Sequence, residues 1–452
     1  MVTFGTGMQE TKKTPAGLAY ALVFALWLAA VLVYARAQKP VAFNGGLGWD
    51  GARYEVMYEQ ARDGQKFFAE KPFAYRVATP WIAGHLGFRD ARKAFHAVNL
   101  ASILLTGLLI MAMMRALGAR TGISLFLIAV WLLQWHAPLR QQFYDSFGVD
   151  AASQPFTCLI FLAHLRLGRP GARYGALSLL AFLGVFFRES VAFAAAAVCL
   201  AELVVASRDK GWLAALRAPA ARLSALPLLA AALGIAITHR LAEATGPYGF
   251  FNTVAYFLYH KPLPVLVHAF YNGYGTALIP VLVFWRRAWA HIRREPLLGI
   301  YPLITFLLGW TAGGDTTRIN FWGCFALLPL MSLVLSELRL ATFGIAPFLL
   351  LEIICTRMAW PFPEYPGPEA WRLPLLTNWG SAFPYFDLWS ELANPRVLMI
   401  SLFQYLALTA AAFLWIGKAG RSAYLRPDAG DLDAPASATT RAASPEPSGR
   451  MA

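Results

Sequence analysis

The stretch AGLAYALVFALWLAAVLVYAR (residues 16–36) decides the fold class, because it is long, apolar and free of charge up to its final arginine. A helix of about 20 such residues spans the hydrocarbon core of a bilayer. The whole chain has the same character: 58% of its 452 residues are hydrophobic and 14% are charged. A soluble protein carries about 25% charged residues. The sequence therefore predicts an all-α polytopic membrane protein.

Further apolar stretches predict further spans. The first apolar segment ends in ARAQ (35–38), which imitates a signal-peptide cleavage site. Its apolar run exceeds the roughly 7–15 residues of a signal peptide, so we expect a retained anchor. A single transmembrane domain covers residues 1–426, and an Ala-, Ser- and Pro-rich tail at 427–452 is expected to be disordered. We expect about 12 transmembrane helices, at about 16–36, 94–114, 121–137, 149–166, 173–188, 190–206, 222–239, 263–285, 296–312, 320–337, 341–356 and 397–417.

Basic residues cluster in every second connection and set the expected orientation. Short loops rich in Lys and Arg stay in the cytoplasm. This rule puts both termini in the cytoplasm and accounts for the net charge of +14 without nucleic acid, for which the sequence has no basic module. High Ala and Arg usage is typical of a GC-rich bacterial genome, so we expect the membrane to be a bacterial plasma membrane. The basic clusters lie at Lys12 and Lys13, at about 115–120, 166–173, 208–222 and 286–294, and at 418–426.

The remaining connections hold nearly every polar cluster worth naming, and the alternation places them all on the outer face. The first is long, from about 38 to 93, and is expected to contain an interfacial helix. The others contain RQQFYDSFGVD (140–150), FFRES (186–190), a Tyr- and Phe-rich stretch (240–262), GGDTTRIN (313–320) and a Trp- and Pro-rich loop (357–396). We therefore expect a polar site at this face.

The residues GWDGARYEVMYEQARDG (48–64) predict the interfacial helix, over 50–64. At helical spacing Tyr54, Met57, Tyr58 and Ala61 share one face, and such a helix lies along a membrane surface. Asp50 stands at its start. One interpretation makes Asp50 an N-cap. The other makes its carboxylate a general base, or a ligand for a cation, where a polar substrate meets the lipid headgroups.

Four outer arginines are candidates for binding a phosphate, since guanidinium groups bind phosphates bidentately. Each has a plainer interpretation. Arg76 can extend to lipid phosphates, and Arg188 can be neutralised by the neighbouring Glu189. Arg318 can pair with Asp315 one helical turn away. In the fourth case Arg140 precedes Asp145 and Asp150, and charges buried near a helix end mark either function or a structural ion pair.

Several kinds of site find no support in the sequence. The four cysteines lie in apolar stretches without CxxC spacing, which is typical of buried, inert thiols. The histidines match no HExxH or other ligand spacing, so no metal site is predicted. Walker A, Rossmann and nucleophile-elbow patterns are lacking, and the one DxD, at Asp431 and Asp433, falls in the tail.

In its layout, and in WDGARYEVM (49–57), the chain resembles the GT-C superfamily of integral membrane glycosyltransferases. PFAYRVATPW (72–81) and FFRES are similar to segments of bacterial membrane proteins grouped with that superfamily. The resemblance implies a polyprenyl-phosphate sugar as donor, a glycan or lipid acceptor, and inversion at the anomeric carbon. It makes Asp50 the base. Many members carry two adjacent acids, whereas here Asp50 is followed by Gly51 and the next acid is Glu55. This departure argues against a metal-dependent mechanism, so the resemblance does not firmly imply a divalent cation.

We therefore expect a membrane glycosyltransferase of the cell envelope. Two alternatives stay open: a lipid-linked glycan ligase or polymerase, and a flippase. A flippase needs ionisable residues at mid-membrane depth, for which only Glu202 and Glu352 qualify. The expected site consists of Asp50 and Glu55 as catalytic acids, of Arg76, Arg140, Arg188 and Arg318 at the donor phosphate, and of Tyr54, Tyr75, Asp145, Asp150, Glu189 and Asp315 in support.

Overall fold

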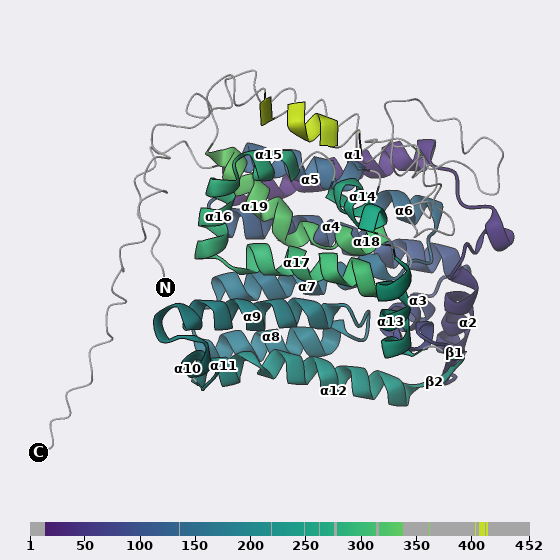
Figure 1. The fold of residues 1–452 in the computed structure, drawn as a ribbon. Helices are drawn as coiled ribbons and strands as arrows, with labels where there is room; N and C mark the ends of the chain where they lie inside the picture. The colour runs from purple at the N-terminus through teal and green to yellow at the C-terminus, as the bar shows by residue number, and fades with distance from the viewer. Residues whose placement is uncertain are drawn as a thin grey trace, which may run out of the picture.

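Long apolar helices lie side by side through most of the chain, and their polar connections gather at the ends of the bundle (Figure 1). The computed structural model describes residues 14–337, apart from 135, 218, 248, 262, 275–277 and 313–315, and in addition 361, 403, 406–411 and 413–414. The expected spans 341–356 and 397–417, the loop 357–396 and the tail 427–452 lie outside the described residues, except for residue 361 and the helical positions 403, 406–411 and 413–414.

The first ten expected spans all coincide with helices. One of them, 263–285, consists of two helices, and its last residue, Trp285, begins a separate amphipathic helix. The bundle helices are α1 (Ala16–Ala37), α4 (Ala91–Ala116), α5 (Thr121–Leu133), α6 (Pro138–Tyr144), α7 (Asp150–Arg166), α8 (Pro170–Gly184), α9 (Val191–Lys210), α12 (Leu226–Leu241), α14 (Leu263–Tyr274), α15 (Leu278–Val283), α17 (Leu297–Thr311) and α19 (Cys324–Ser336).

Five helical segments in the described part of the chain are long and apolar enough to cross a membrane: 16–37, 91–116, 121–144, 191–208 and 222–241. The second of these runs over 26 residues, about 39 Å at 1.5 Å per residue. Other apolar helices are shorter. Two of these, α17 and α19, contain an internal proline, Pro302 in α17 and Pro329 in α19. The structure thus agrees with a polytopic helical protein, and it leaves the expected count of about 12 spans unconfirmed.

Small residues let the bundle helices approach closely. Helix α12 lies along α8, and α4 lies along α7. At Gly234 of α12, an added Cβ would stand 2.5 Å from Cγ2 of Val185 and 2.8 Å from the carbonyl oxygen of Phe182. Both distances are shorter than a van der Waals contact. Glycine at this position therefore sets how near the two helices lie, as small residues do in membrane bundles.

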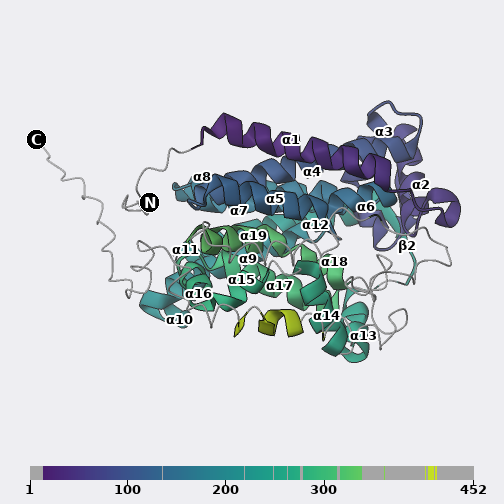
Figure 2. The ribbon, with the colours of Figure 1, turned by 90° about the horizontal axis from the view of Figure 1, so that it is seen from above.

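One end of the bundle carries the smaller elements, and it is the end where the predicted outer connections meet. Strand β1 (Phe67–Glu70) of the first loop pairs in parallel with β2 (Ala242–Thr245), which follows α12. Figure 2 shows β2 beside α2, with α3 close by. The other small elements are η1 (Phe43–Gly46), α2 (Gly51–Arg62), η2 (Phe73–Tyr75), α3 (Ala78–His85), α13 (Phe250–His260) and α18 (Thr316–Phe321).

The opposite end carries three short helices, and which end faces the cytoplasm stays a prediction. These are α10 (Trp212–Arg217), α11 (Pro219–Ser224) and α16 (Trp285–Arg294).

Helix α2 confirms the face predicted from its sequence. Tyr54, Met57, Tyr58 and Ala61 are all buried, and Glu59 is exposed. The buried face packs against protein, however, with α3, α4 and β1 as its neighbours. At the α3 contact an added Cβ on Gly84 would lie 2.8 Å from Cβ of Ala61. The helix is therefore part of a small folded cap on the bundle.

Substituting Gly234 by alanine tests the packing of α12 on α8. The new Cβ must push back Val185 and the backbone of Phe182, so we expect the free energy of unfolding to fall by about 1–3 kcal/mol. Gly175 of α8 has nothing within 4 Å of an added Cβ, and Gly175→Ala is the matched control, which we expect to be neutral or stabilising because alanine favours the helix. Thermal melting in detergent measures both, and an equal response of the two variants would contradict the packing argument.

Candidate active site

Two of the predicted acids flank the loop between α6 and α7: Asp145 follows α6, and Asp150 begins α7. A buried asparagine holds this loop. Asn99 of α4 is fully buried. Its amide nitrogen lies 2.8 Å from Oε1 of Gln142, 3.2 Å from the carbonyl oxygen of Ser146 and 2.8 Å from that of Gly148. Backbone groups of a loop need such partners when they are buried. Helix α4 therefore fixes the position of Asp145 and Asp150 through Asn99.

Asp50 stands where a cap would stand, but its carboxylate does not cap α2. It occupies the residue before Gly51, and its side chain makes no capping hydrogen bond. The N-cap interpretation is therefore wrong for this side chain. Burial raises the pKa of both Asp145 and Tyr54, and the negative charge of the half-buried Asp50 carboxylate adds to this effect at each. Asp50 thus belongs to a cluster of polar groups at the end of the bundle.

Asp145 is buried, and its pKa is raised to about 7. Burial is the main cause, because it penalises the charged form, and the negative charge of Asp50 adds to it. The backbone N–H of Phe147, which donates to Oδ1 at 3.2 Å, and the charges of Arg318 and Arg92 lower it in part. Asp50 and Asp145 together form the acidic pair of the site.

Glycine at position 48 makes room for this pair. Its φ is +67°, a backbone conformation that favours glycine. An added Cβ would stand 2.6 Å from Oδ2 of Asp145. The backbone of the first loop therefore lies directly against the Asp145 carboxyl group, two residues before Asp50.

Asp150 is shared by two arginines from distant parts of the chain. Arg188, between α8 and α9, forms an ion pair with Oδ1 of Asp150 through Nη1. Arg318 of α18 places Nε 3.5 Å from Oδ2. Two guanidinium groups therefore lie around one carboxylate. Guanidinium groups at the mouth of an apolar bundle can also bind an incoming anion.

Arg188 is the more deeply set of the two arginines. Its guanidinium lies 4.8 Å from the ring centroid of Trp322, and its Nε is buried without a hydrogen-bond partner among the described residues. Burial lowers the pKa of Arg188 to about 9, and the positive charges of Arg76 and Arg318 contribute. The three arginines are thus close enough to repel one another, which is the arrangement that a bound anion would relieve.

Arg76 is held by Glu189, the acid that the sequence analysis paired with Arg188. Nη2 donates to Oε1 of Glu189 at 2.6 Å, Nε to Oε2 at 3.1 Å, and Nη1 to the Tyr54 hydroxyl at 3.2 Å. Burial raises the pKa of Glu189, but Arg76 and Arg188 outweigh it and bring that pKa down to about 2. Glu189 therefore neutralises Arg76, and the chief partner of Arg188 is Asp150.

Arg140 lies inside the bundle. It is fully buried on α6, where Nη2 donates to the carbonyl oxygen of Leu133 at 2.8 Å and to the Tyr34 hydroxyl at 3.3 Å. These bonds join α6 to α5 and α1. A guanidinium used in this way supports the fold, and we leave Arg140 out of the proposed phosphate site.

Three further predicted residues have different outcomes. Tyr75 stacks on the His239 ring, with ring centroids 3.8 Å apart and planes 6° from parallel, and so joins the first loop to α12. Glu55 is half-buried on α2, and its role stays a prediction. Asp315 lies outside the described residues. Among those that are described, no three His, Cys, Asp or Glu side chains gather as metal ligands would.

The sequence interpretation missed Asn99, Arg92 and Trp322. Arg92 donates from Nη2 to the carbonyl oxygen of Gly46 at 2.8 Å and so anchors the loop before Asp50. Asn99 had a signal in the sequence, because a lone polar amide within the apolar stretch 94–114 is costly unless it is bonded. Trp322 had none, since tryptophans are common throughout this chain.

Comparison with known proteins gives one structural similarity. No family model matches the chain, and no curated protein matches it in sequence. A crystal structure of ArnT from Cupriavidus metallidurans bound to undecaprenyl phosphate is similar to it with a TM-score of 0.48 and 14% sequence identity, over 90% of this chain and 78% of that chain.

The raised pKa of Asp145 predicts a pH dependence of stability. The unfolded chain has an aspartate pKa near 3.9, so the folded state binds more protons between about pH 4 and pH 7. The contribution of Asp145 to the free energy of unfolding therefore falls as pH rises through this window, on the order of 1 kcal/mol for each unit by which its pKa is raised.

Asp145→Asn removes this group and gives the measurement. We expect the melting temperature of the wild type, relative to the variant, to fall as pH rises from 4 to 7. A constant difference between the two proteins across that window would show that the Asp145 carboxyl group has an ordinary pKa.

Proposed function

We propose that the chain is a membrane glycosyltransferase of the GT-C type, which transfers a sugar from a polyprenyl-phosphate donor to a glycan or lipid acceptor. The observation that carries the proposal is the gathering of guanidinium groups and carboxylates at one end of an apolar bundle. Asp150 with Arg188 and Arg318 forms a cationic half, in which two guanidinium groups lie around one carboxylate. Asp50 and Asp145 form an acidic half, coupled through their charges.

The two halves match the two needs of this reaction. A polyprenyl-phosphate donor stays in the bilayer, so the enzyme must bind its phosphate at the depth of the lipid headgroups. Guanidinium groups at that depth can do so. The acceptor hydroxyl needs a base, which must lie close to the same point. Arg188 and Arg318 supply the first need, and Asp50 supplies the second. Arg76, neutralised by Glu189, positions Tyr54 beside the acidic half.

The proposed step is a displacement at the anomeric carbon. The acceptor oxygen attacks that carbon while Asp50 takes the proton of its hydroxyl group. The bond between the anomeric carbon and the phosphate oxygen breaks, and its electron pair leaves with polyprenyl phosphate. The anomeric configuration inverts. The cationic half stabilises the negative charge that grows on the leaving phosphate, which is electrostatic stabilisation by groups already in place.

Of the two candidate residues for the flippase alternative, the structure describes Glu202 of α9. Its Oε1 lies 3.2 Å from Nη2 of Arg173 and 3.4 Å from Nδ1 of His164. Glu202 is therefore part of a local ion cluster, whereas a flippase needs ionisable residues along several helices. Glu352 lies outside the described residues. The ligase or polymerase alternative uses the same lipid phosphate, and the products separate it from single-sugar transfer.

Asp50→Asn tests the base. We expect it to abolish transfer with folding intact, because the amide keeps the shape of the side chain but cannot take a proton. A strain lacking the protein is complemented with the wild type, with Asp50→Asn, or with Asp63→Asn, a matched control at the exposed end of α2. Mass spectrometry then profiles the envelope glycans and the polyprenyl-phosphate sugars, with equal membrane levels of the three proteins.

The account expects one sugar to disappear from the glycans, its lipid donor to accumulate, and only the wild type and Asp63→Asn to restore it. Full complementation by Asp50→Asn would remove Asp50 from the chemistry. Accumulation of complete, undecorated lipid-linked glycans would favour the ligase or the flippase.

Arg318→Gln tests the cationic half. The variant keeps the ion pair between Arg188 and Asp150, so we expect the fold to survive. A charge-assisted hydrogen bond contributes about 1.5–3 kcal/mol, so the KM for the polyprenyl-phosphate sugar should rise about 10- to 150-fold. Arg318→Lys should restore part of this loss, and Arg89→Gln, an exposed residue before α4, should have no effect. An unchanged KM in Arg318→Gln would place the donor phosphate elsewhere.

A further inference from the structure

Helix α16 lies at the end of the bundle opposite the candidate active site, and its inner face is fastened. Arg287 and His291 are buried. Nε2 of His291 lies 2.7 Å from Oε1 of Glu337, the residue that closes α19, and Nε of Arg287 lies 4.0 Å from Oε2. These contacts hold the helix in one orientation on the bundle. Its outer face is therefore presented in a fixed way.

The outer face is basic and aromatic. Trp285 and Trp289 are 53% and 52% exposed. The guanidinium of Arg286 lies 5.8 Å from the ring centroid of Trp285. The sequence of α16, WRRAWAHIRR, contains no acid. Five side chains of α16 are exposed on this face, and together we call them the α16 surface: Trp285, Arg286, Trp289, Arg293 and Arg294.

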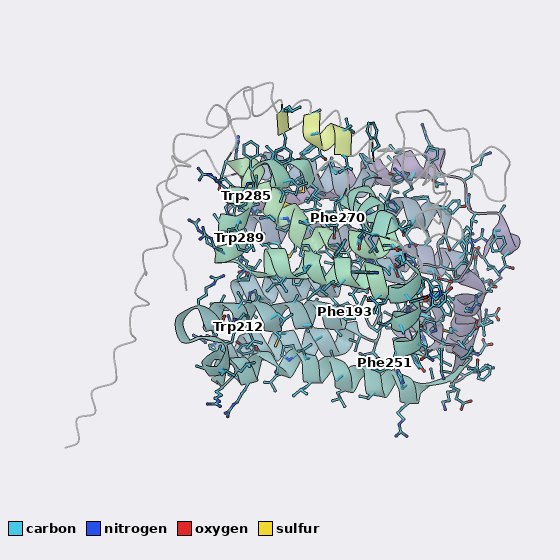
Figure 3. All side chains as sticks on the ribbon, in the orientation of Figure 1. Phe193, Trp212, Phe251, Phe270, Trp285 and Trp289 are labelled. Carbon is cyan, nitrogen blue, oxygen red and sulfur yellow. The ribbon has the colours of Figure 1, made fainter. Side chains whose placement is uncertain are left out.

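A second element at the same end has the same character. Helix α10 exposes Trp212, Leu213 and Leu216, and it ends at the exposed Arg217. Figure 3 shows Trp212, Trp285 and Trp289 at one end of the bundle, away from α2 and the two strands. Tryptophans in this position at the ends of apolar helices lie at the level of the lipid headgroups.

We propose that the α16 surface binds the headgroups of anionic phospholipids. Arginines bind phosphate groups bidentately, and the tryptophan rings fit the boundary between headgroups and acyl chains. The alternative occupant is an acidic protein. The lipid is the better fit, because the exposed Trp and Leu side chains of α10 continue the aromatic and apolar character at the same end of a membrane-spanning bundle. This proposal does not depend on the glycosyltransferase reaction.

Lipid binding to the full-length protein tests the proposal. Native mass spectrometry in a neutral detergent follows the binding of phosphatidylglycerol and of phosphatidylcholine with the same acyl chains. Three proteins are compared. They are the wild type, the α16 variant Arg286→Gln/Arg293→Gln/Arg294→Gln, and a control variant with the same charge change at the active-site end of the bundle. The control, Arg62→Gln/Arg89→Gln/Arg240→Gln, also removes three exposed arginines.

We expect the α16 variant to bind phosphatidylglycerol at least about tenfold more weakly than the wild type, since each arginine at a membrane surface contributes about fivefold, equal to about 1 kcal/mol. The control should bind as the wild type does. Raising the salt from 0.1 M to about 1 M should weaken the wild type in the same way, because it screens the arginines. This second measurement needs no variant.

Three results would overturn the proposal. The first is unchanged phosphatidylglycerol binding by the α16 variant. The second is an equal loss in the control variant, and the third is equal binding of phosphatidylcholine and phosphatidylglycerol by the wild type. Loss of a co-purifying acidic protein from the α16 variant, with lipid binding retained, would assign the surface to that protein instead.

Discussion

The carboxylate of Asp150, shared by Arg188 and Arg318, is the interaction on which this end of the molecule depends. It joins the start of α7 to the turn between α8 and α9 and to α18, which are far apart in the sequence. Ion pairs buried in this way contribute little net stability, because desolvation offsets the attraction. Their value lies in fixing where the charges are. The two guanidinium groups around this carboxylate can also bind a second anion.

The remaining contacts of the site support this arrangement from two sides. Asn99 holds the loop between Asp145 and Asp150, and Arg92 holds the loop that precedes Asp50. Arg76 and Glu189 form a neutral pair next to the shared carboxylate. The acidic pair Asp50 and Asp145 and the two arginines Arg188 and Arg318 therefore lie at the same end of the bundle, where the charge of Arg318 acts on Asp145. A donor phosphate and an acceptor hydroxyl need both groups close to one point.

The sequence predicted the helices and the meeting of the polar connections, but not the partners within the site. Hydrophobic length locates α1 and α4, and the alternation of connections brings Arg76, Asp150 and Arg188 to one end. Partner choice depends on the turn between α8 and α9, where adjacent residues point in different directions. For that reason Glu189 reaches Arg76, while Arg188 reaches Asp150. Arg140 shows the same limit, because only tertiary packing reveals that its guanidinium turns into the bundle.

A structure of the full-length protein with a polyprenyl phosphate, determined by cryo-electron microscopy, tests the central claim most directly. The account predicts phosphate density within hydrogen-bonding distance of the guanidinium groups of Arg188 and Arg318, with the lipid chain leading into the bilayer and Asp50 facing the space beside the phosphate. Phosphate density away from both arginines, or on the far side of the bundle from Asp50, would contradict it.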